Sequence, residues 1–311
     1  MNAPVKHAAR AFAPASDGNA IAGFDLLGHS IHGPRDTVTV RRIDSPEVRI
    51  DAIRGCATGL PTDPQHNTAG AALMALRRAL DLDFGFAVEL DKGIPFGSGM
   101  GGSAASCVAA LVAANELLDH PLTRHQLYPL ALAGEAASSG GLHGDNLGPM
   151  LLGGLCLSLL DRLVELPVPE GLTAVLVHPE HEIETRHARS VLNRGFALPD
   201  VVCQSGHLTL LMAGLYQGDF GLVAAGLDDV LVMPRRACLI PGFDDVRSAA
   251  LGHNALGAGI SGAGPSMVAW FQNREQAELA AAPMQQAFAG AGVDSRAFVS
   301  SVAGPAAGVL P

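Results

Sequence analysis

Through the first hundred residues, apolar and polar positions mostly alternate or carry β-branched side chains, which is the pattern of strands with one buried face. Such stretches occur at 5–13, 36–43, 47–53 and 85–91, and one stretch with helical spacing lies between them at 67–82. From residue 103 the helical spacing becomes the dominant pattern. We expect helices at 103–118 and 123–139, followed by a strand at 152–160.

A stretch of charges and prolines, DRLVELPVPEGL at 161–172, interrupts the apolar pattern and marks a boundary. Beyond it the sequence predicts a strand at 173–179, helices across about 185–226 and 242–252, strands at 255–261 and 266–271, a helix at 274–292 and a strand at 295–301. Paired strands alternating with helices predict an α+β sandwich with helices on one face. We therefore expect two units, 1–162 and 163–311, in a chain of 311 residues.

Composition excludes several classes of protein. With 48% hydrophobic and 5% aromatic residues, the chain can bury a large aliphatic core. The net charge of −10 and the lack of long basic runs argue against nucleic-acid binding. No apolar run reaches the roughly 18 residues of a membrane span, and the start of the chain lacks the apolar block of a signal sequence, so we expect a cytoplasmic protein with no membrane partner. Five separated cysteines without a C-x-x-C pair indicate neither a disulfide framework nor a zinc site.

The densest glycine cluster, GIPFGSGMGGSAAS at 93–106, lies between an expected strand and an expected helix. Its G-x-G-x-x-G spacing occurs in dinucleotide-binding loops, but here the helix leads into another helix instead of a second parallel strand. A Walker loop needs a lysine, and none follows Lys92; a protein kinase needs H-R-D, which the chain lacks. Backbone amides freed of side chains beside a helix N-terminus form an anion cradle, and phosphate is the expected guest.

The same stretch, from Pro95 onward, resembles the P-x-x-x-G-[LM]-G-S-S-A-A motif of the GHMP small-molecule kinases. Residues 13–28 (APASDGNAIAGFDLLG) resemble the N-terminal substrate motif of that family, and 256–271 (LGAGISGAGPSMVAWF) resemble its C-terminal glycine-rich motif. The resemblance implies an α+β fold with an N-terminal α/β sandwich (ribosomal-protein-like), a C-terminal ferredoxin-like domain, and ATP with Mg²⁺ at their junction. Gly102 stands where the family usually has the first of two serines, and Ser103 keeps the second.

Four further segments, at 60–70, 134–154, 179–192 and 233–243, resemble the members of the family that phosphorylate L-homoserine. The resemblance implies O-phosphorylation of L-homoserine by ATP in threonine biosynthesis, and a homodimer. Alternatives are a GHMP kinase for another alcohol such as shikimate or an isoprenoid, an inactive small-molecule sensor on the same fold, and an NAD-dependent oxidoreductase. A sensor would lack Glu135 or Ser103, and both are present. Paired arginines favour an amino acid over an isoprenoid, whose tail needs apolar walls.

For the nucleotide end of the site, Mg²⁺ prefers a carboxylate, an occasional hydroxyl, phosphate oxygens and waters. The resemblance assigns Ser103 and Glu135 to the metal. Lys92 is expected to meet phosphate oxygens, and Asn67 to cap a helix, contact adenine, or both. The ATP-binding residues that the resemblance implies are Asn67, Lys92, Pro95, Phe96, Gly97, Ser98, Gly99, Met100, Gly101, Gly102, Ser103, Ala104 and Ala105.

L-Homoserine offers an ammonium, a carboxylate and the reacting hydroxyl, so its site needs arginines and carboxylate or amide acceptors. Arg189 and Arg236 are expected to bind the carboxylate, with Arg235 as the alternative to Arg236. The implied substrate-binding residues are Asn19, Asp25, His143, Asp145, Arg189, Arg236 and Gly264, with Asp25 and Asp145 meeting the ammonium and hydroxyl. The catalytic set is Asn146, Asp145, Ser103 and Glu135.

For the reaction itself, the resemblance places Asn146 where some members of the family carry an aspartate base, and an amide cannot take a proton at neutral pH. We therefore expect direct in-line attack, with Asn146 and Asp145 orienting the hydroxyl. The histidines and glutamates at 178–187 fit no strong zinc signature and are interpreted as a solvated loop.

Overall fold

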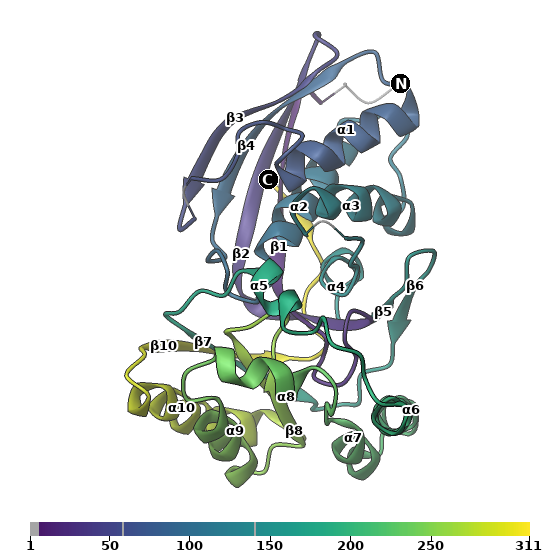
Figure 1. Cartoon of the computed structure of the whole chain (residues 1–311). Coiled ribbons are helices and arrows are strands. Elements are labelled where there is room, and N and C mark those ends of the chain that lie inside the picture. The colour runs from purple at the N-terminus through teal and green to yellow at the C-terminus, as the bar shows by residue number, and fades with distance from the viewer. Residues whose placement is uncertain (1–5, 58, 140) are drawn as a thin grey trace.

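The computed structural model describes residues 6–57, 59–139 and 141–311, which form two β-sheets with helices packed against them (Figure 1). In the larger sheet the strand order is β11-β1-β2-β4-β3, and β5 and β6 extend from the first part of β2. Neighbouring strands are antiparallel except β3 and β4, which are parallel. The strands are β1 (Ala8–Gly18), β2 (Leu27–Ile43), β3 (Val48–Gly55), β4 (Gly85–Lys92), β5 (Leu155–Ser158), β6 (Leu163–Leu166) and β11 (Gly308–Leu310).

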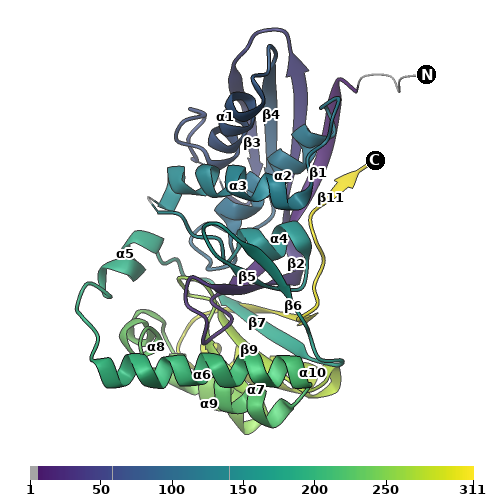
Figure 2. The ribbon, with the colours of Figure 1, turned by 90° about the vertical axis from the view of Figure 1, so that its right-hand side faces the viewer.

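Four helices cover one face of this sheet: α1 (Thr68–Leu80), α2 (Gly102–Asn115), α3 (Arg124–Ser139) and α4 (Leu147–Leu152) (Figure 2). Helix α2 is the central one, and every residue from Ala104 to Ala114 is buried. Its alanines let the helix approach the sheet on one side and α1 and α3 on the other, because methyl groups need little space. The N-terminus of α2 is thereby held in a fixed place at the edge of the core.

The smaller sheet has the order β10-β7-β9-β8, and all its pairs are antiparallel. In chain order this is 4-1-3-2 with helices between the strands, the ferredoxin-like arrangement that we expected. Its strands are β7 (Thr173–Pro179), β8 (Gly257–Ile260), β9 (Met267–Phe271) and β10 (Ser295–Ser301). Helices α9 (Phe243–Gly252) and α10 (Arg274–Gly290) pack on one face. Trp270 faces the other way, where its indole N–H donates to His29 Nε2 of β2 at 3.2 Å. Residues of α6 (Leu198–Gln217) and α7 (Phe220–Gly226) belong to the same apolar cluster as Trp270, so the expectation of helices on a single face is wrong here.

Most expected elements are confirmed within a few residues, and the differences lie in short or irregular segments. Strand β2 begins at Leu27 instead of residue 36, because glycines and a proline hide the pattern of its first half. The helical region at 185–226 is three helices, α5 (Thr185–Ser190), α6 and α7. Helices α4 and α8 (Met233–Arg236), the 3₁₀ turn η1 (Ala237–Leu239) and strands β6 and β11 were not expected. Val5, the first residue of an expected strand, lies outside the described residues.

Segments of both sequence halves meet at the glycine loop. Ser261 donates to the carbonyl of Gly99 at 3.0 Å, and Ser266 donates to the carbonyl of Ser98 at 2.6 Å. The division at 162 and 163 stays a proposal, since β6 and β11 belong to the second half of the chain but lie in the larger sheet. Among the described helices, none combines the length and apolar character needed to span a membrane.

Candidate active site

A cavity of about 520 Å³ lies where the glycine loop, the first turns of α1 and α2, the β1–β2 connection and α5 meet. Eighteen of the expected site residues line it: Asn19, Asp25, Asn67, Lys92, Pro95, Phe96, Gly97, Ser98, Gly99, Gly101, Gly102, Ser103, Glu135, His143, Asp145, Asn146, Arg189 and Arg236. Residues from 19 to 236 along the sequence thus converge on one space. Met100, Ala104, Ala105 and Gly264 are not in the lining; the first three are buried in the core.

The glycine loop has a backbone that side chains would block. Gly97, Gly99 and Gly101 have φ of 61°, 75° and 70°, the left-handed region that glycine occupies without strain. A Cβ on Gly99 would lie 2.5 Å from the carbonyl oxygen of Ser261, and one on Gly101 would lie 2.7 Å from Ser16 Oγ. These glycines are therefore required by conformation and by close packing together.

Helix α2 starts at Gly102 directly after this loop, and no side chain in the described part of the protein caps it. The N–H groups of its first turn therefore remain available to an anion, which the helix dipole also favours. Gly102 itself is permissive, because a Cβ there would lie 3.3 Å from the side chain of Ile94 and its φ is not positive. Glycine in place of the usual serine leaves the cradle intact.

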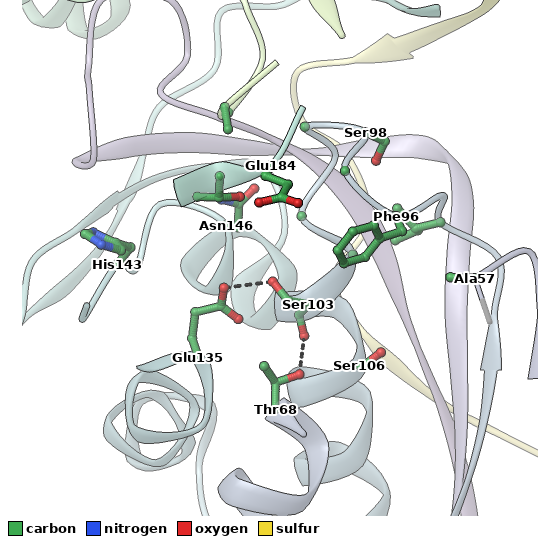
Figure 3. Close-up of a pocket in the computed structure, with 18 of the residues that line it drawn as sticks. Ala57, Thr68, Phe96, Ser98, Ser103, Ser106, Glu135, His143, Asn146 and Glu184 are labelled. Carbon is green, nitrogen blue, oxygen red and sulfur yellow. Dashed lines mark hydrogen bonds between the residues drawn. The ribbon is translucent and has the colours of Figure 1, made fainter. Parts of the chain in front are cut away.

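The two residues expected to hold the metal, Ser103 and Glu135, lie within hydrogen-bond distance of each other. Ser103 Oγ donates to Glu135 Oε1 at 2.8 Å, and Thr68 Oγ1 donates to the carbonyl of Ser103 at 2.9 Å (Figure 3). Burial raises the pKa of Glu135 to about 7, opposed by the hydrogen bond from Ser103, and the charge of Asp145 raises that pKa further. A hydroxyl and a carboxylate beside an anion cradle fit Mg²⁺, which keeps waters and takes substrate phosphates as ligands. Within the described residues, no three His, Cys, Asp or Glu side chains form a metal cage by themselves.

At the other end of the cavity, charged side chains pair with one another. Arg189 makes a two-point contact with Asp25, with Nη1 to Oδ2 at 3.1 Å and Nη2 to Oδ1 at 2.8 Å. His143 Nδ1 lies 3.5 Å from Asp25 Oδ2. Burial lowers the pKa of His143, while the charge of Asp25 raises it. This end therefore presents a matched positive and negative group instead of a single free charge.

Arg236 is the inward-facing member of the arginine pair. Its guanidinium donates to the carbonyls of Ala188 at 3.0 Å and Gly262 at 3.1 Å, and burial lowers its pKa to about 10. Arg235 instead donates to the carbonyls of Arg194 and Gly195 on an exposed loop. The alternative of an inward-facing Arg235 is therefore wrong.

Asp145 and Asn146 lie between the two ends, just before α4. Burial raises the pKa of Asp145 to about 7, with a further increase from the charge of Asp25. Ser16 Oγ donates to Asn146 Oδ1 at 2.7 Å, which fixes the orientation of this amide against β1. A Cβ on Gly18 would lie 2.5 Å from Asp145 Oδ2, so this glycine leaves the room that the pair occupies. Ser16 and Gly18 belong to the substrate-like motif at 13–28, but only the structure shows what they contact.

Two side chains that we expected to contact ATP, Lys92 and Asn67, already have hydrogen-bond partners within the protein. The ammonium of Lys92 contacts Asp36, the carbonyl of Gly102 and Ser106 Oγ. Asn67 Oδ1 accepts from the N–H groups of Ala69 and Gly70, and Asn67 Nδ2 donates to the carbonyl of Pro61. Asn67 is therefore the N-cap of α1, one of the two roles expected for it, and it also pins the preceding loop.

Sequence reasoning missed further lining residues because ordinary side chains carry no motif. Near the start of α1 and the glycine loop they are Ala57, Leu60, Pro61, His66, Thr68, Leu90, Ile94 and Ser106, and near α3, α5 and the β8–β9 turn they are Ala137, Ile183, Glu184, Thr185, Arg186, Gly262 and Ala263. The apolar members of the first group line the same cavity as Phe96. His178 is outside the cavity, with its ring beside Ser266 Oγ.

Comparison with known proteins gives consistent matches over the whole chain. The family model for the GHMP kinases N terminal domain matches residues 67–154, and the model for the GHMP kinases C terminal domain matches 211–290. Homoserine kinase from Xylella fastidiosa (strain M12) is 58% identical over 100% of this chain and 96% of its own length. Homoserine kinase from Xanthomonas campestris pv. campestris (strain B100) is 60% identical over 97% and 94%. The crystal structure of homoserine kinase from Cytophaga hutchinsonii ATCC 33406 superposes with a TM-score of 0.95 at 38% identity, covering 100% of this chain and 99% of that one.

Proposed function

The chain belongs to the GHMP kinase family and, within it, to the homoserine kinases, and we propose that it transfers the γ-phosphoryl group of ATP to the side-chain hydroxyl of L-homoserine. The product, O-phospho-L-homoserine, serves threonine biosynthesis. One observation carries the proposal: a single cavity holds an uncapped helix N-terminus with the Ser103–Glu135 pair at one end and the Arg189–Asp25 pair at the other. Each end suits one of the two substrates.

The triphosphate lies along the glycine loop with its anionic oxygens toward the first-turn amides of α2. Ser103 and Glu135 would hold Mg²⁺, and the bound ion would neutralise negative charge on the phosphate oxygens. Glu135 must lose its proton for this role, and a bound cation favours the charged form. The adenine ring packs among the apolar residues near Phe96.

L-Homoserine enters by exchanging partners with the Arg189–Asp25 pair. Its carboxylate takes the guanidinium of Arg189, and its ammonium takes the carboxylate of Asp25, so each of these half-buried charges keeps a partner. Arg236 supplies a second positive charge and is held in place by the carbonyls of Ala188 and Gly262. An alcohol without an ammonium leaves Asp25 unpaired, which disfavours the alternative substrate shikimate.

The reacting hydroxyl lies beside Asp145 and Asn146. The bond from Ser16 occupies Asn146 Oδ1, so the amide N–H groups are the donors that this side chain can offer to the substrate hydroxyl. Phosphoryl transfer passes through a loose transition state, so orientation of the hydroxyl and charge stabilisation contribute more than a strong base. We therefore retain in-line attack with Asn146 and Asp145 as orienting groups.

ADP release, measured over a panel of L-homoserine, L-threonine, shikimate and mevalonate with Mg²⁺ and ATP, tests the function. We expect turnover with L-homoserine to exceed turnover with shikimate and mevalonate by at least about a hundredfold, because neither carries an ammonium for Asp25. L-Threonine carries both charged groups, but its hydroxyl is one carbon closer to them, so we expect slower turnover with it as well. Preferred turnover of shikimate or mevalonate would assign the chain to another branch of the family. The homodimer and the cytoplasmic location implied by the family stay proposals, to be tested by light scattering and by cell fractionation.

A further inference from the structure

A buried polar cluster lies beneath the glycine loop, where β2, β4 and α2 meet. Asp36 on β2, Lys92 at the end of β4 and Ser106 on α2 are 1%, 6% and 4% exposed. Lys92 Nζ contacts Asp36 Oδ2 and donates to the carbonyl of Gly102 at 2.6 Å and to Ser106 Oγ at 2.8 Å. An ammonium has three protons, so each one has a partner within the protein.

The carboxylate of Asp36 holds both ends of the loop. Its Oδ1 accepts from the backbone N–H groups of Gly93 at 3.0 Å and Ile94 at 3.1 Å, the first two residues after β4. Its Oδ2 accepts from Ser106 Oγ at 2.8 Å and contacts Lys92, which in turn binds the carbonyl in the first turn of α2. The point where the loop leaves β4 and the point where it enters α2 are thereby joined through one side chain.

We propose that Asp36, Lys92 and Ser106 form a clamp that positions the glycine loop for the triphosphate, and that Lys92 does not itself bind phosphate. The proposal rests on the proposed function, because it concerns the ATP end of the same cavity. Amides preorganised toward an anion lose effect when they shift by a fraction of an ångström. A buried ion pair offsets its desolvation cost only when hydrogen bonds satisfy its remaining groups, and this cluster meets that condition.

Direct contact between Lys92 and phosphate is the rival explanation, since Lys92 lines the cavity. The two explanations predict different effects on ATP affinity when Asp36 is changed. Asp36 itself does not line the cavity. If Lys92 binds phosphate, Asp36→Asn releases the ammonium from its counter-ion, and ATP affinity rises or stays the same. If the three residues form a clamp, Asp36→Asn weakens ATP binding as Lys92→Met does, because either change opens the same contact.

Isothermal titration calorimetry of ATP with the full chain, in wild type, Asp36→Asn, Lys92→Met and the double variant, decides between them. We expect each single change to raise the Kd by at least about tenfold, given the sensitivity of such sites to displacement. The double variant should be no weaker than the weaker single, because the two residues act as one unit. The KM for L-homoserine should change by less than about twofold.

Glu89→Gln is the matched control. Glu89 lies on the same strand as Lys92 and pairs with Arg41 of β2 at 2.7 Å, on a part of the sheet open to solvent. Exposed pairs of this kind contribute little, so ATP affinity should not change. If a charge-removing variant does not fold, Ser106→Ala removes a single hydroxyl from the same cluster and is measured in the same way.

Unchanged or tighter ATP binding by Asp36→Asn, or unchanged binding by Ser106→Ala where that variant replaces it, would overturn the clamp. Losses of ATP affinity that simply add in the double variant would also overturn it. Failure of the proposed function is a separate result, since it would appear as a wild-type protein that binds no ATP or does not phosphorylate L-homoserine. In the absence of ATP binding, the clamp is judged by thermal unfolding, where independent effects of the Asp36 and Lys92 changes would refute it.

Discussion

The two ends of the cavity differ in which groups form them: backbone groups at one end and charged side chains at the other. The proposed phosphate end is mainly backbone: three glycines with positive φ and a helix start that no side chain of the described residues caps. The acceptor end is mainly charged side chains that pair with one another, with Arg189 on Asp25 and His143 beside it. A backbone site is fixed as soon as the chain folds, whereas a side-chain site changes partners when its ligand arrives.

This difference explains how much of the site could be predicted from the sequence. A loop that needs positive φ leaves glycines in a row, so the amino-acid sequence alone locates the cradle at 97–102. The pairing of Arg189 with Asp25, 164 residues apart, leaves no local pattern. Ser16 beneath Asn146 and Asp36 beneath Lys92 were missed for the same reason, since their roles exist only after the sheet has formed.

The helices and strands likewise divide into those that the sequence predicts and those that it does not. Helix α2 and strands β4 and β7 were predicted within a few residues, because each contains an apolar run bounded by glycine, proline or polar residues. Strand β11 has three residues and pairs with β1 from the far end of the chain. Helix α8 has four residues. Elements this short are set by tertiary contacts, and their own sequence carries too few positions for a period to appear.

Removing the metal carboxylate should give the largest loss at the phosphate end. Glu135→Ala should lower kcat by at least about a thousandfold at ordinary Mg²⁺, because a hard anionic ligand is lost where charge develops in the transition state. Steady-state ADP release measures the effect, and circular dichroism checks the fold. Retention of near wild-type turnover would show that the metal is held elsewhere.

A side chain in the loop should test whether the phosphate end is a backbone site. Gly101→Val should raise the ATP Kd by more than about a hundredfold, because φ is 70° there and a Cβ would lie 2.7 Å from Ser16 Oγ. Gly102→Ala is the matched control, since its Cβ meets only Ile94 at 3.3 Å and its φ is not positive. Calorimetry with ATP compares the two, and equal affinities would mean that loop geometry does not decide binding.

Changing the acceptor end should separate it from the phosphate end. Arg189→Leu should lower kcat/KM for L-homoserine by about 30-fold to several thousandfold, or roughly 2 to 5 kcal/mol, because a desolvated carboxylate loses its partner. The ATP Kd should barely change. Arg189→Lys should recover only part of the loss, because an ammonium cannot repeat the planar two-point contact.

Arg235→Leu, on the outward-facing neighbour of Arg236, is the control for an arginine lost nearby. Equal losses for Arg189→Leu in L-homoserine kinetics and in ATP binding would indicate that Arg189 faces the nucleotide or holds the two halves together. If Arg189→Leu changes neither L-homoserine kinetics nor ATP binding, Arg236 is the residue that binds the substrate carboxylate.

The smallest effect is on stability, and its sign follows from burial. The pKa of Glu135 is raised from 4.5 to about 7, so below about pH 4.5 the group is protonated in both states and burial of the charge costs nothing. Between about pH 4.5 and 7 the unfolded chain releases the proton that the folded protein keeps, so this residue makes folding less favourable as pH rises, by about 3 kcal/mol at most.

Glu135→Gln removes that dependence. The variant should therefore gain thermal stability relative to wild type on going from pH 5 to pH 8, measured by scanning calorimetry with EDTA present. Saturating Mg²⁺ and ATP should shrink or reverse the gain, because the cation stabilises the ionised form in the wild type alone. A difference in melting temperature that stays constant with pH would mean that Glu135 is ionised in the folded protein without any metal, and the phosphate end would then hold a negative charge before its ligand arrives.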